Sequence, residues 1–339
     1  MEKLIFDSDK PMLVVMVGLP GSGKSTVADN IFIKSTLEDS IRKPIIHSSD
    51  ALRKELFGSE NVQEDPTKVF AELHKRIKEN LKDGKDVVFD VTNINKKKRI
   101  AFLNELKRID CNKICVVVMT PYDICIRQDA KRDRVVGDAP IKKMYMNWTP
   151  PSQTEGFDSV EYVFNYGDKN VEKEFNVQVL FDRLNNIDQE NRHHTLTIGE
   201  HCTETMLNVM DDNKRVDRLT VAAMLHDIGK EFTKMRGDDG QCHYYQHHCV
   251  SAYDSLFYLN AYGVHKNDMS YISNLIYYHM HPYMSWAQSE KAMVKDKHLL
   301  GDMFTDVMKL HDADVKAHQL THDKNIIENV WKEVHEIER

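Results

Sequence analysis

The stretch MLVVMVGLPGSGKST, residues 12–26, decides the fold class of the first part of this 339-residue chain. Its first seven residues form an apolar run that ends in glycine, which is typical of a buried parallel strand. The rest fits GxxxxGK[ST], a pattern whose glycines let backbone N–H groups surround phosphate oxygens. The stretch KSTVADNIF (24–32) then has the pattern of a helix. The order of strand, glycine-rich loop and helix predicts a nucleotide-binding site.

The chemistry of the loop suggests a role for each of its polar side chains. Lys24 can reach the β and γ phosphate oxygens, and the Ser25 hydroxyl can bind Mg²⁺. The donor that we expect is ATP or GTP with Mg²⁺. The residues predicted to contact the nucleotide at the loop are Gly18, Gly21, Ser22, Gly23, Lys24, Ser25 and Thr26.

Further apolar runs at 43–50, 85–93 and 113–121 alternate with helical patterns. Strands that alternate with helices predict a doubly wound parallel sheet. The pattern breaks between about 140 and 165, where Pro, Gly and polar residues precede a last predicted strand, VEYVFNY (160–166). From residue 180 onward the periodicity is helical nearly to the end. We therefore expect an α/β domain over 1–167 and an all-α helical bundle over 168–339.

The composition is that of a globular protein, with 41% hydrophobic and 29% charged residues. The net charge of -7 argues against a general nucleic-acid coat but allows a local basic groove. Six cysteines without CxxC pairs, no membrane-length apolar run and no signal-peptide core predict a cytoplasmic protein without a membrane partner. Most of the 17 histidines follow residue 190, which suggests a second chemistry in the second half.

Two stretches beyond the loop carry groups suited to phosphoryl transfer. Asp50 follows the strand predicted at 43–50, and Arg53 lies three residues later on one helix face. A carboxylate there can accept a proton from an attacking hydroxyl, and an arginine can hold a phosphate. Asp50 is also expected to be the N-cap of its helix, a role compatible with catalysis.

The stretch IRQDAKRDRVVG (126–137) is either a solvated helix face or a basic lid that closes over the transferred phosphoryl group. Spacing does not decide which arginine contacts the phosphates. We rank Arg132 first, ahead of Arg134 and Arg127.

In this order, GLPGSGKST, SSDALR, DVTNINKKKR and the arginine-rich stretch resemble the 5′-kinase domain of phage polynucleotide kinases and their bacterial end-healing relatives, over about residues 12–165. The resemblance implies that Asp50 is the general base and that Arg53 contacts the acceptor's phosphate. It also implies that Thr92 and Asn93 line the acceptor site. The same pattern serves some small-molecule and toxin kinases. The run 96–99 is either a phosphate-tracking patch or a solvated helix start.

The second half contains histidines and aspartates spaced for metal binding. His226 and Asp227 end an apolar helical stretch, LTVAAMLHDIGK, and Lys230 lies one turn later, placed for a phosphate oxygen. Four more candidates lie on or beside amphipathic helical stretches, in the order H…HD…H…H…D. They are His201, His247, His279 and Asp314.

This order resembles the HD phosphohydrolase superfamily, over about residues 176–320. The resemblance implies a helical bundle with one or two divalent metals. His201, His226, Asp227 and Asp314 would form the main site, and His247 and His279 would complete a second site or contact the scissile phosphate. Nitrogen and oxygen ligands suit Mn²⁺, Mg²⁺, Fe or Ni. The neighbours His193, His194, His243, His248, His281 and Asp312 remain alternatives.

A kinase and a hydrolase in one chain are explained if they act on different ends of a break. Many nucleases leave RNA with a 5′-hydroxyl and a 2′,3′-cyclic phosphate, whereas ligases need a 5′-phosphate and a 3′-hydroxyl. We therefore expect a bifunctional enzyme for RNA or DNA ends, broken RNA above all, that acts before a separate RNA ligase. The kinase resemblance also suggests a phage origin. The alternatives are a nucleoside or metabolite kinase fused to an HD nucleotidase or to a regulatory HD module.

Overall fold

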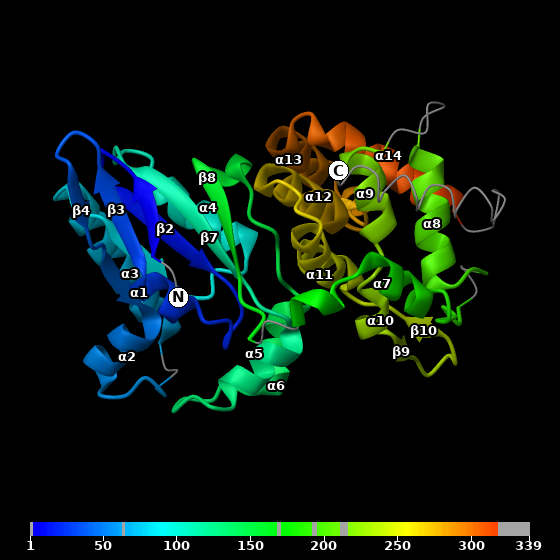
Figure 1. Ribbon diagram of the computed structural model, residues 1–339, viewed down its shortest axis with the longest axis horizontal. Helices are drawn as coiled ribbons and strands as arrows, with labels where there is room; N and C mark the ends of the chain where they lie inside the picture. The colour runs from blue at the N-terminus through cyan, green and yellow to red at the C-terminus, as the bar shows by residue number, and fades with distance from the viewer. Residues whose placement is uncertain (1–2, 63–64, 168–170, 192–194, 211–215, 318–339) are drawn as a thin grey trace. The chain divides into compact units, whose positions relative to one another are not determined.

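A computed structural model describes residues 3–62, 65–167, 171–191, 195–210 and 216–317 (Figure 1). The chain forms two compact units, Met1–Met144 with Pro151–Gly167, and Tyr145–Pro150 with Asp168–Arg339. The segment Tyr145–Pro150, which the sequence-based division assigns to the first domain, packs within the second unit. The Tyr145 hydroxyl donates a hydrogen bond to Asp254 (2.6 Å), and Trp148 packs edge-on against Tyr253. Because of these buried aromatic contacts, the segment belongs to the second unit although it lies between two parts of the first in the sequence.

The first unit contains a five-stranded sheet, as the alternating apolar runs predict. All neighbouring strands are parallel, and they lie in the order β5-β6-β2-β7-β8. The central strand is buried at every residue. The strands are β5 (Ile45–Ser48), β6 (Val87–Asp90), β2 (Met12–Val17), β7 (Asn112–Met119) and β8 (Ser159–Phe164).

Helices flank this sheet. They are α1 (Lys24–Asp29), α2 (Ser49–Phe57), α3 (Pro66–Lys82), α4 (Lys96–Glu105), α5 (Tyr122–Asp129) and α6 (Asp138–Tyr145). A 3₁₀ turn, η1 (Gln153–Glu155), precedes β8. The order of strands and helices places the loops that follow β2, β5, β6 and β7 at one edge of the parallel sheet, where ligands bind in such folds.

The helix predicted over 24–32 is shorter than expected. It ends at Asp29, and the chain continues as β3 (Ile31–Ser35) in a separate three-stranded sheet with β1 (Leu4–Asp7) and β4 (Ser40–Arg42). Ile31 and Ile33 are buried against the core around β2, whereas Phe32 between them is less buried. This alternation has the period of a strand, and it overrides the helical pattern.

The second unit is largely helical, as predicted. Its helices include α7 (Val177–Leu184), α8 (Ile198–Val209), α9 (Arg218–Leu225), α10 (Lys230–Thr233), α11 (His247–Ala261), α12 (Lys266–Tyr278), α13 (Glu290–Leu300) and α14 (Met303–Lys316). A short hairpin of β9 (Met235–Arg236) and β10 (Cys242–His243) precedes α11. Helix α8 packs on α9 and α14, and α12 packs on α9 and α11. No helix within the described residues is long and apolar enough to cross a membrane.

Candidate functional sites

The loop after β2 has the backbone conformation that its glycines were expected to allow. Gly21 and Gly23 have positive φ angles, 76° and 89°. A Cβ atom at Gly21 would lie 2.2 Å from the carbonyl oxygen of Cys125, so no larger residue fits there. The Lys24 ammonium, at the start of α1, donates to the Leu19 carbonyl within the loop (2.7 Å). The loop is therefore a preformed cradle with its lysine held inside.

A cleft of about 810 Å³ opens over this loop. Gly18 and Ser22 are buried and lie outside its lining. Thr92 lines the cleft, whereas Asn93 does not, because its amide donates to the Met16 carbonyl (2.9 Å). The candidate residues in the lining are Gly21, Gly23, Lys24, Ser25, Thr26, Asp50, Arg53, Thr92, Arg132 and Arg134.

Asp90, at the end of β6, is a site residue that the sequence reasoning did not single out. It lines the cleft, and the Ser25 hydroxyl donates to its carboxylate (2.7 Å). Burial raises the pKa of Asp90, although Lys24 and Ser25 oppose this effect. Burial likewise lowers the pKa of Lys24, and Asp90 opposes it. A hydroxyl and a carboxylate oxygen suit Mg²⁺, so this pair fits the expected ion. The sequence signal for Asp90 was VVFD (87–90), an apolar strand that ends in an aspartate.

Asp50 faces the cleft from the first turn of α2, but it is not the helix N-cap. That position belongs to Ser48, whose hydroxyl accepts from the Ala51 amide (3.1 Å). The Asp50 carboxylate instead contacts three guanidinium groups. Arg53 lies at 3.5 Å, Arg132 at 3.7 Å, and Arg134 is in direct contact. The predicted acceptor and lid residues thus converge on one carboxylate.

Arg127 lies away from this group. It pairs with Asp123 (2.7 Å) and does not line the cleft, because its side chain lies on the exposed face of α5, whereas Gln128 of the same helix does line it. The basic run 96–99 is not a continuous surface patch. Lys96 and Arg99 are buried, and only Lys98 lines the cleft.

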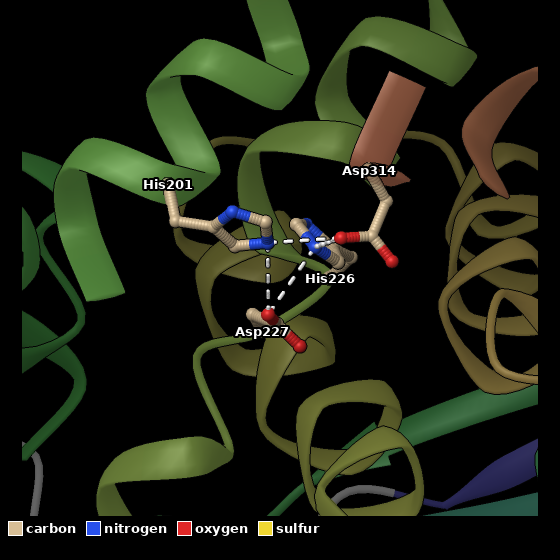
Figure 2. A group of neighbouring side chains, drawn as sticks. All are labelled: His201, His226, Asp227 and Asp314. Carbon is tan, nitrogen blue, oxygen red and sulfur yellow. Dashed lines mark ion pairs between the residues drawn. The ribbon is translucent and has the colours of Figure 1, made fainter. Parts of the chain in front are cut away.

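In the second unit, four predicted ligands meet (Figure 2). His201 comes from α8, Asp314 from α14, and His226 and Asp227 directly follow α9. One ligand atom from each lies within 4.8 Å of the others. His201 Nε2 is 3.2 Å from Asp227 and 2.9 Å from Asp314. His226 Nε2 is 3.4 Å from Asp227 and 3.6 Å from Asp314.

Asp227 also belongs to a second group, with His247 at the start of α11 and His279 just after α12. Its Oδ1 atom lies 3.1 Å from His247 Nε2 and 3.7 Å from His279 Nε2. Its Oδ2 atom faces His201 and His226. One carboxylate therefore bridges two sets of imidazoles, an arrangement able to hold two cations.

The four histidines share a hydrogen-bond pattern that prepares them as ligands. In each, Nδ1 lies within hydrogen-bond distance of a backbone carbonyl, and Nε2 is the ring nitrogen that faces the rest of the group. His247 Nε2 and His279 Nε2 lie 3.3 Å apart. The carbonyls belong to Ala317 (3.0 Å), Ala223 (2.7 Å), Tyr244 (2.8 Å) and Ile276 (2.6 Å) for His201, His226, His247 and His279.

The buried ionisable groups of this cluster shift one another's pKa values. Burial lowers the pKa of His279 to about 3, so its imidazole is neutral at pH 7. Burial alone would raise the pKa of Asp227, but His226 and Lys230 hold it well below its ordinary value. Against the effect of burial, the aspartates raise the pKa of His201 and hold that of His226 well above its ordinary value. Because metal ligands are neutral imidazoles and ionised carboxylates, an ion such as Mn²⁺, Fe, Ni or Mg²⁺ would displace protons from these two histidines. The residues present therefore fit such an ion.

Lys230 is buried beside this group. Its ammonium lies 2.6 Å from Asp227 Oδ2 and donates to Gln189 Oε1 (2.8 Å). The lysine predicted to contact a phosphate oxygen thus contacts the bridging carboxylate here.

Those alternative ligands that the structure describes lie outside both groups. His248 is buried against Tyr277, and His243 pairs with Asp239 (3.2 Å). Burial holds the pKa of His248 well below its ordinary value. His281 packs against Tyr278, and Asp312 is exposed on α14. His193 and His194 lie outside the described residues.

Comparison with known proteins finds a family model and several relatives. Residues 13–151 match the family model described as AAA domain. An L-seryl-tRNA(Sec) kinase of Methanococcus maripaludis is 26% identical over 211 residues, 62% of this chain and 77% of that protein. A candidate bifunctional polynucleotide phosphatase/kinase of Acanthamoeba polyphaga mimivirus is 23% identical over 174 residues, 49% of this chain and 36% of that protein.

Among solved structures, a fungal RNA kinase is similar over 52% of this chain and 44% of its own, with a TM-score of 0.36 and 16% identity. The parallel sheet, the glycine-rich cradle and the match of residues 13–151 to the AAA domain model are those of a P-loop nucleotide-binding domain. The relatives named above include kinases.

Proposed function

We propose that the first unit transfers the γ-phosphate of ATP or GTP to the 5′-hydroxyl of a polynucleotide, RNA above all. The relatives named for tRNA and polynucleotide substrates support a nucleic-acid acceptor. The cleft supports the reaction type, because it combines the phosphate cradle with a carboxylate among three arginines. A cationic wall of this kind suits a reaction in which negative charge moves between two phosphate groups.

Each residue of the cleft would have a distinct role in this transfer. Lys24 would hold the β and γ oxygens of the donor, and Ser25 and Asp90 would hold Mg²⁺, which neutralises phosphate charge when bound. Asp50 would accept the proton of the attacking 5′-hydroxyl. Arg132 and Arg134 would stabilise the transferred phosphoryl group, and Arg53 would hold a phosphate of the acceptor. Thr92 would line the acceptor side. Asn93, hydrogen-bonded to the Met16 carbonyl, would fix the backbone beside it.

We propose that the second unit is a metal-dependent phosphohydrolase that clears 2′,3′-cyclic phosphate and 3′-phosphate ends. One water would open the cyclic ester to a monophosphate, and a second would release inorganic phosphate and leave the 2′,3′-diol. The side chains that would hold one or two ions are His201, His226, Asp227, His247, His279 and Asp314. Such ions supply a nucleophile at neutral pH and neutralise phosphate oxygens. Lys230 would orient Asp227 and lie close to the substrate phosphate.

The observation that carries this proposal is the bridging position of Asp227. Its two oxygens face different pairs of histidines, and each of these histidines presents Nε2 inward. Structural ion pairs alone give no reason to gather four imidazoles around one buried carboxylate. The combination of this group with a P-loop domain of the kinase type supports an enzyme that converts both ends of a broken RNA for a separate ligase.

An end-group assay tests both halves. A stem-loop RNA cleaved to leave a 5′-hydroxyl and a 2′,3′-cyclic phosphate is incubated with γ-labelled ATP or GTP, Mg²⁺ and Mn²⁺, beside a matched DNA. We expect label at the 5′ end and a 3′-terminal diol.

Other outcomes would identify the alternatives. Turnover of free nucleosides without labelled oligonucleotide would indicate a metabolite kinase joined to a nucleotidase. A metal-free chain that leaves the cyclic phosphate intact would indicate a regulatory second unit.

A further inference from the structure

The basic loop over residues 130–137 forms one wall of the nucleotide cleft. It begins where α5 ends at Asp129 and returns to α6 at Asp138. Arg132, Arg134 and Val136 line the cleft, so their positions depend on the path of this loop. Asp129 itself is 1% exposed and does not line the cleft.

The Asp129 carboxylate closes the loop from inside. Its Oδ2 atom accepts hydrogen bonds from the Val136 amide (2.8 Å) and the Gly137 amide (2.9 Å). Its Oδ1 atom lies 3.5 Å from a nitrogen of Arg132. One buried carboxylate at the end of α5 thus binds the far end of the loop. It also pairs with Arg132, the arginine ranked first for the transferred phosphate.

We propose that Asp129 is a positioning residue that preorganises the basic loop, so that Arg132 and Arg134 face Asp50 before a nucleotide binds. A buried carboxylate with two amide donors and an arginine is stable only in this loop geometry, because its charge has lost its water. The arginines then need no further ordering when the phosphoryl group arrives, which lowers the cost of reaching the transition state. This inference rests on the proposed kinase function for its kinetic consequence alone.

The chain offers variants that separate the possible roles. Asp129→Ala removes both the amide contacts and the charge, whereas Asp129→Asn keeps an oxygen that can accept from the two amides. Asp123→Asn is the matched control, because Asp123 lies on the same helix but is exposed and pairs with Arg127 (2.7 Å). Arg132→Ala removes the guanidinium through which Asp129 would act.

The first readout needs no kinase activity. Trypsin cleaves after Lys131, Arg132 and Arg134, all within the loop, so the rate of cleavage there reports how often the loop opens. In the full chain we expect Asp129→Ala to be cleaved at the loop about tenfold faster than the wild type. We expect Asp129→Asn and Asp123→Asn to remain close to the wild type. An unchanged cleavage rate in Asp129→Ala would overturn the proposal.

The second readout separates positioning from general stability. We expect Asp129→Ala to lower kcat by about tenfold to a hundredfold, the scale of a misplaced catalytic group. If Asp129 acts through Arg132, the double variant with Arg132→Ala should be little worse than Arg132→Ala alone. Fully additive losses, with a lower unfolding midpoint of the first unit, would contradict this role. A chain without kinase activity would refute the proposed function, while the trypsin rates would still decide whether Asp129 orders the loop.

Discussion

At the scale of single residues, Asp90 links the stability of the first unit to its function. Burial raises the pKa of this carboxyl, so its ionised form costs folding free energy once the pH exceeds its ordinary value, near 3.9. Without nucleotide, we expect Asp90→Asn to unfold at the same or a higher temperature than the wild type at pH 7. Near pH 4 the difference should shrink, because a larger fraction of Asp90 is then protonated.

The same change should impair phosphoryl transfer, because the amide cannot replace a charged ligand for Mg²⁺ beside Ser25. We expect kcat to fall by about a hundredfold or more at pH 7. Thermal unfolding and kinase assays on one preparation measure the two effects. A variant that unfolds much earlier at pH 7 while retaining activity would show that Asp90 is a structural ion-pair partner of Lys24.

Asp314 offers a second test at this scale, because α14 carries a matched control two residues away. We expect Asp314→Asn to lower the metal content of the purified chain, since Asp314 lies beside His201 and His226. Asp312→Asn changes an exposed carboxylate on the same helix and should leave the metal content unaltered. Elemental analysis after dialysis against Mn²⁺ measures both. Equal metal content in the two variants would argue against the ligand set proposed for the main site.

At the scale of elements, a buried ion pair joins α4 to the turn η1. The Arg99 guanidinium makes two 2.7 Å contacts with Glu155, and neither side chain is exposed. Arg99 also donates to the Asn93 carbonyl (2.9 Å), next to Thr92 in the cleft. We expect Glu155→Gln to destabilise the first unit by about 3–5 kcal/mol, because it leaves a buried guanidinium without its counter-charge.

Urea unfolding followed by circular dichroism measures this loss. Lys97→Gln, which changes an exposed residue beside the same helix start, is the control and should shift stability by less than about 0.5 kcal/mol. A comparable loss in both variants would show that α4 depends on the charge of its first turn and not on this ion pair.

The start of α4 shows why part of the site could not be predicted from the sequence. KKKR at 96–99 reads as a charged surface, but two of its four side chains are buried. Burial of Arg99 depends on Glu155, which is 56 residues away in the sequence, and no local pattern encodes that pairing. Similarly, Asp50 fitted the N-cap preference, but Ser48 holds the cap and leaves Asp50 for the cleft. Local preferences identified the elements, and contacts distant in sequence decided which side chains face the cleft.

At the scale of the whole molecule, the sequence was most informative where chemistry restricts residue type and spacing. The glycine-rich loop requires positive φ angles, and metal ligands must be histidine or acidic residues. The first constraint predicted the phosphate cradle after β2, and the second predicted the residues that gather around Asp227. The strand β3 and the packing of Tyr145–Pro150 with the second unit escaped prediction. Both follow from aliphatic and aromatic packing, which many sequences satisfy and which leaves no distinctive motif.

The proposal of two chemistries in one chain makes its sharpest prediction for a pair of variants. Lys24→Met removes the ammonium that would hold the donor phosphates but leaves the second unit unchanged. We expect it to abolish 5′ labelling of a cleaved RNA while removal of the cyclic phosphate continues at the wild-type rate. Asp227→Asn should do the reverse, because its carboxylate bridges both groups of histidines. It should also lower metal content, which is measurable without any substrate.

Both variants should be assayed on the same RNA, with both ends analysed in each reaction. Mixing Lys24→Met with Asp227→Asn should then restore complete conversion, since each chain supplies the activity that the other lacks. A loss of both activities in either single variant would mean that the two centres are coupled, and would favour a second unit that regulates the kinase. If both variants lost 5′ labelling but still removed the cyclic phosphate, a regulatory second unit would again be favoured. Metal binding would then serve phosphoryl transfer and not hydrolysis.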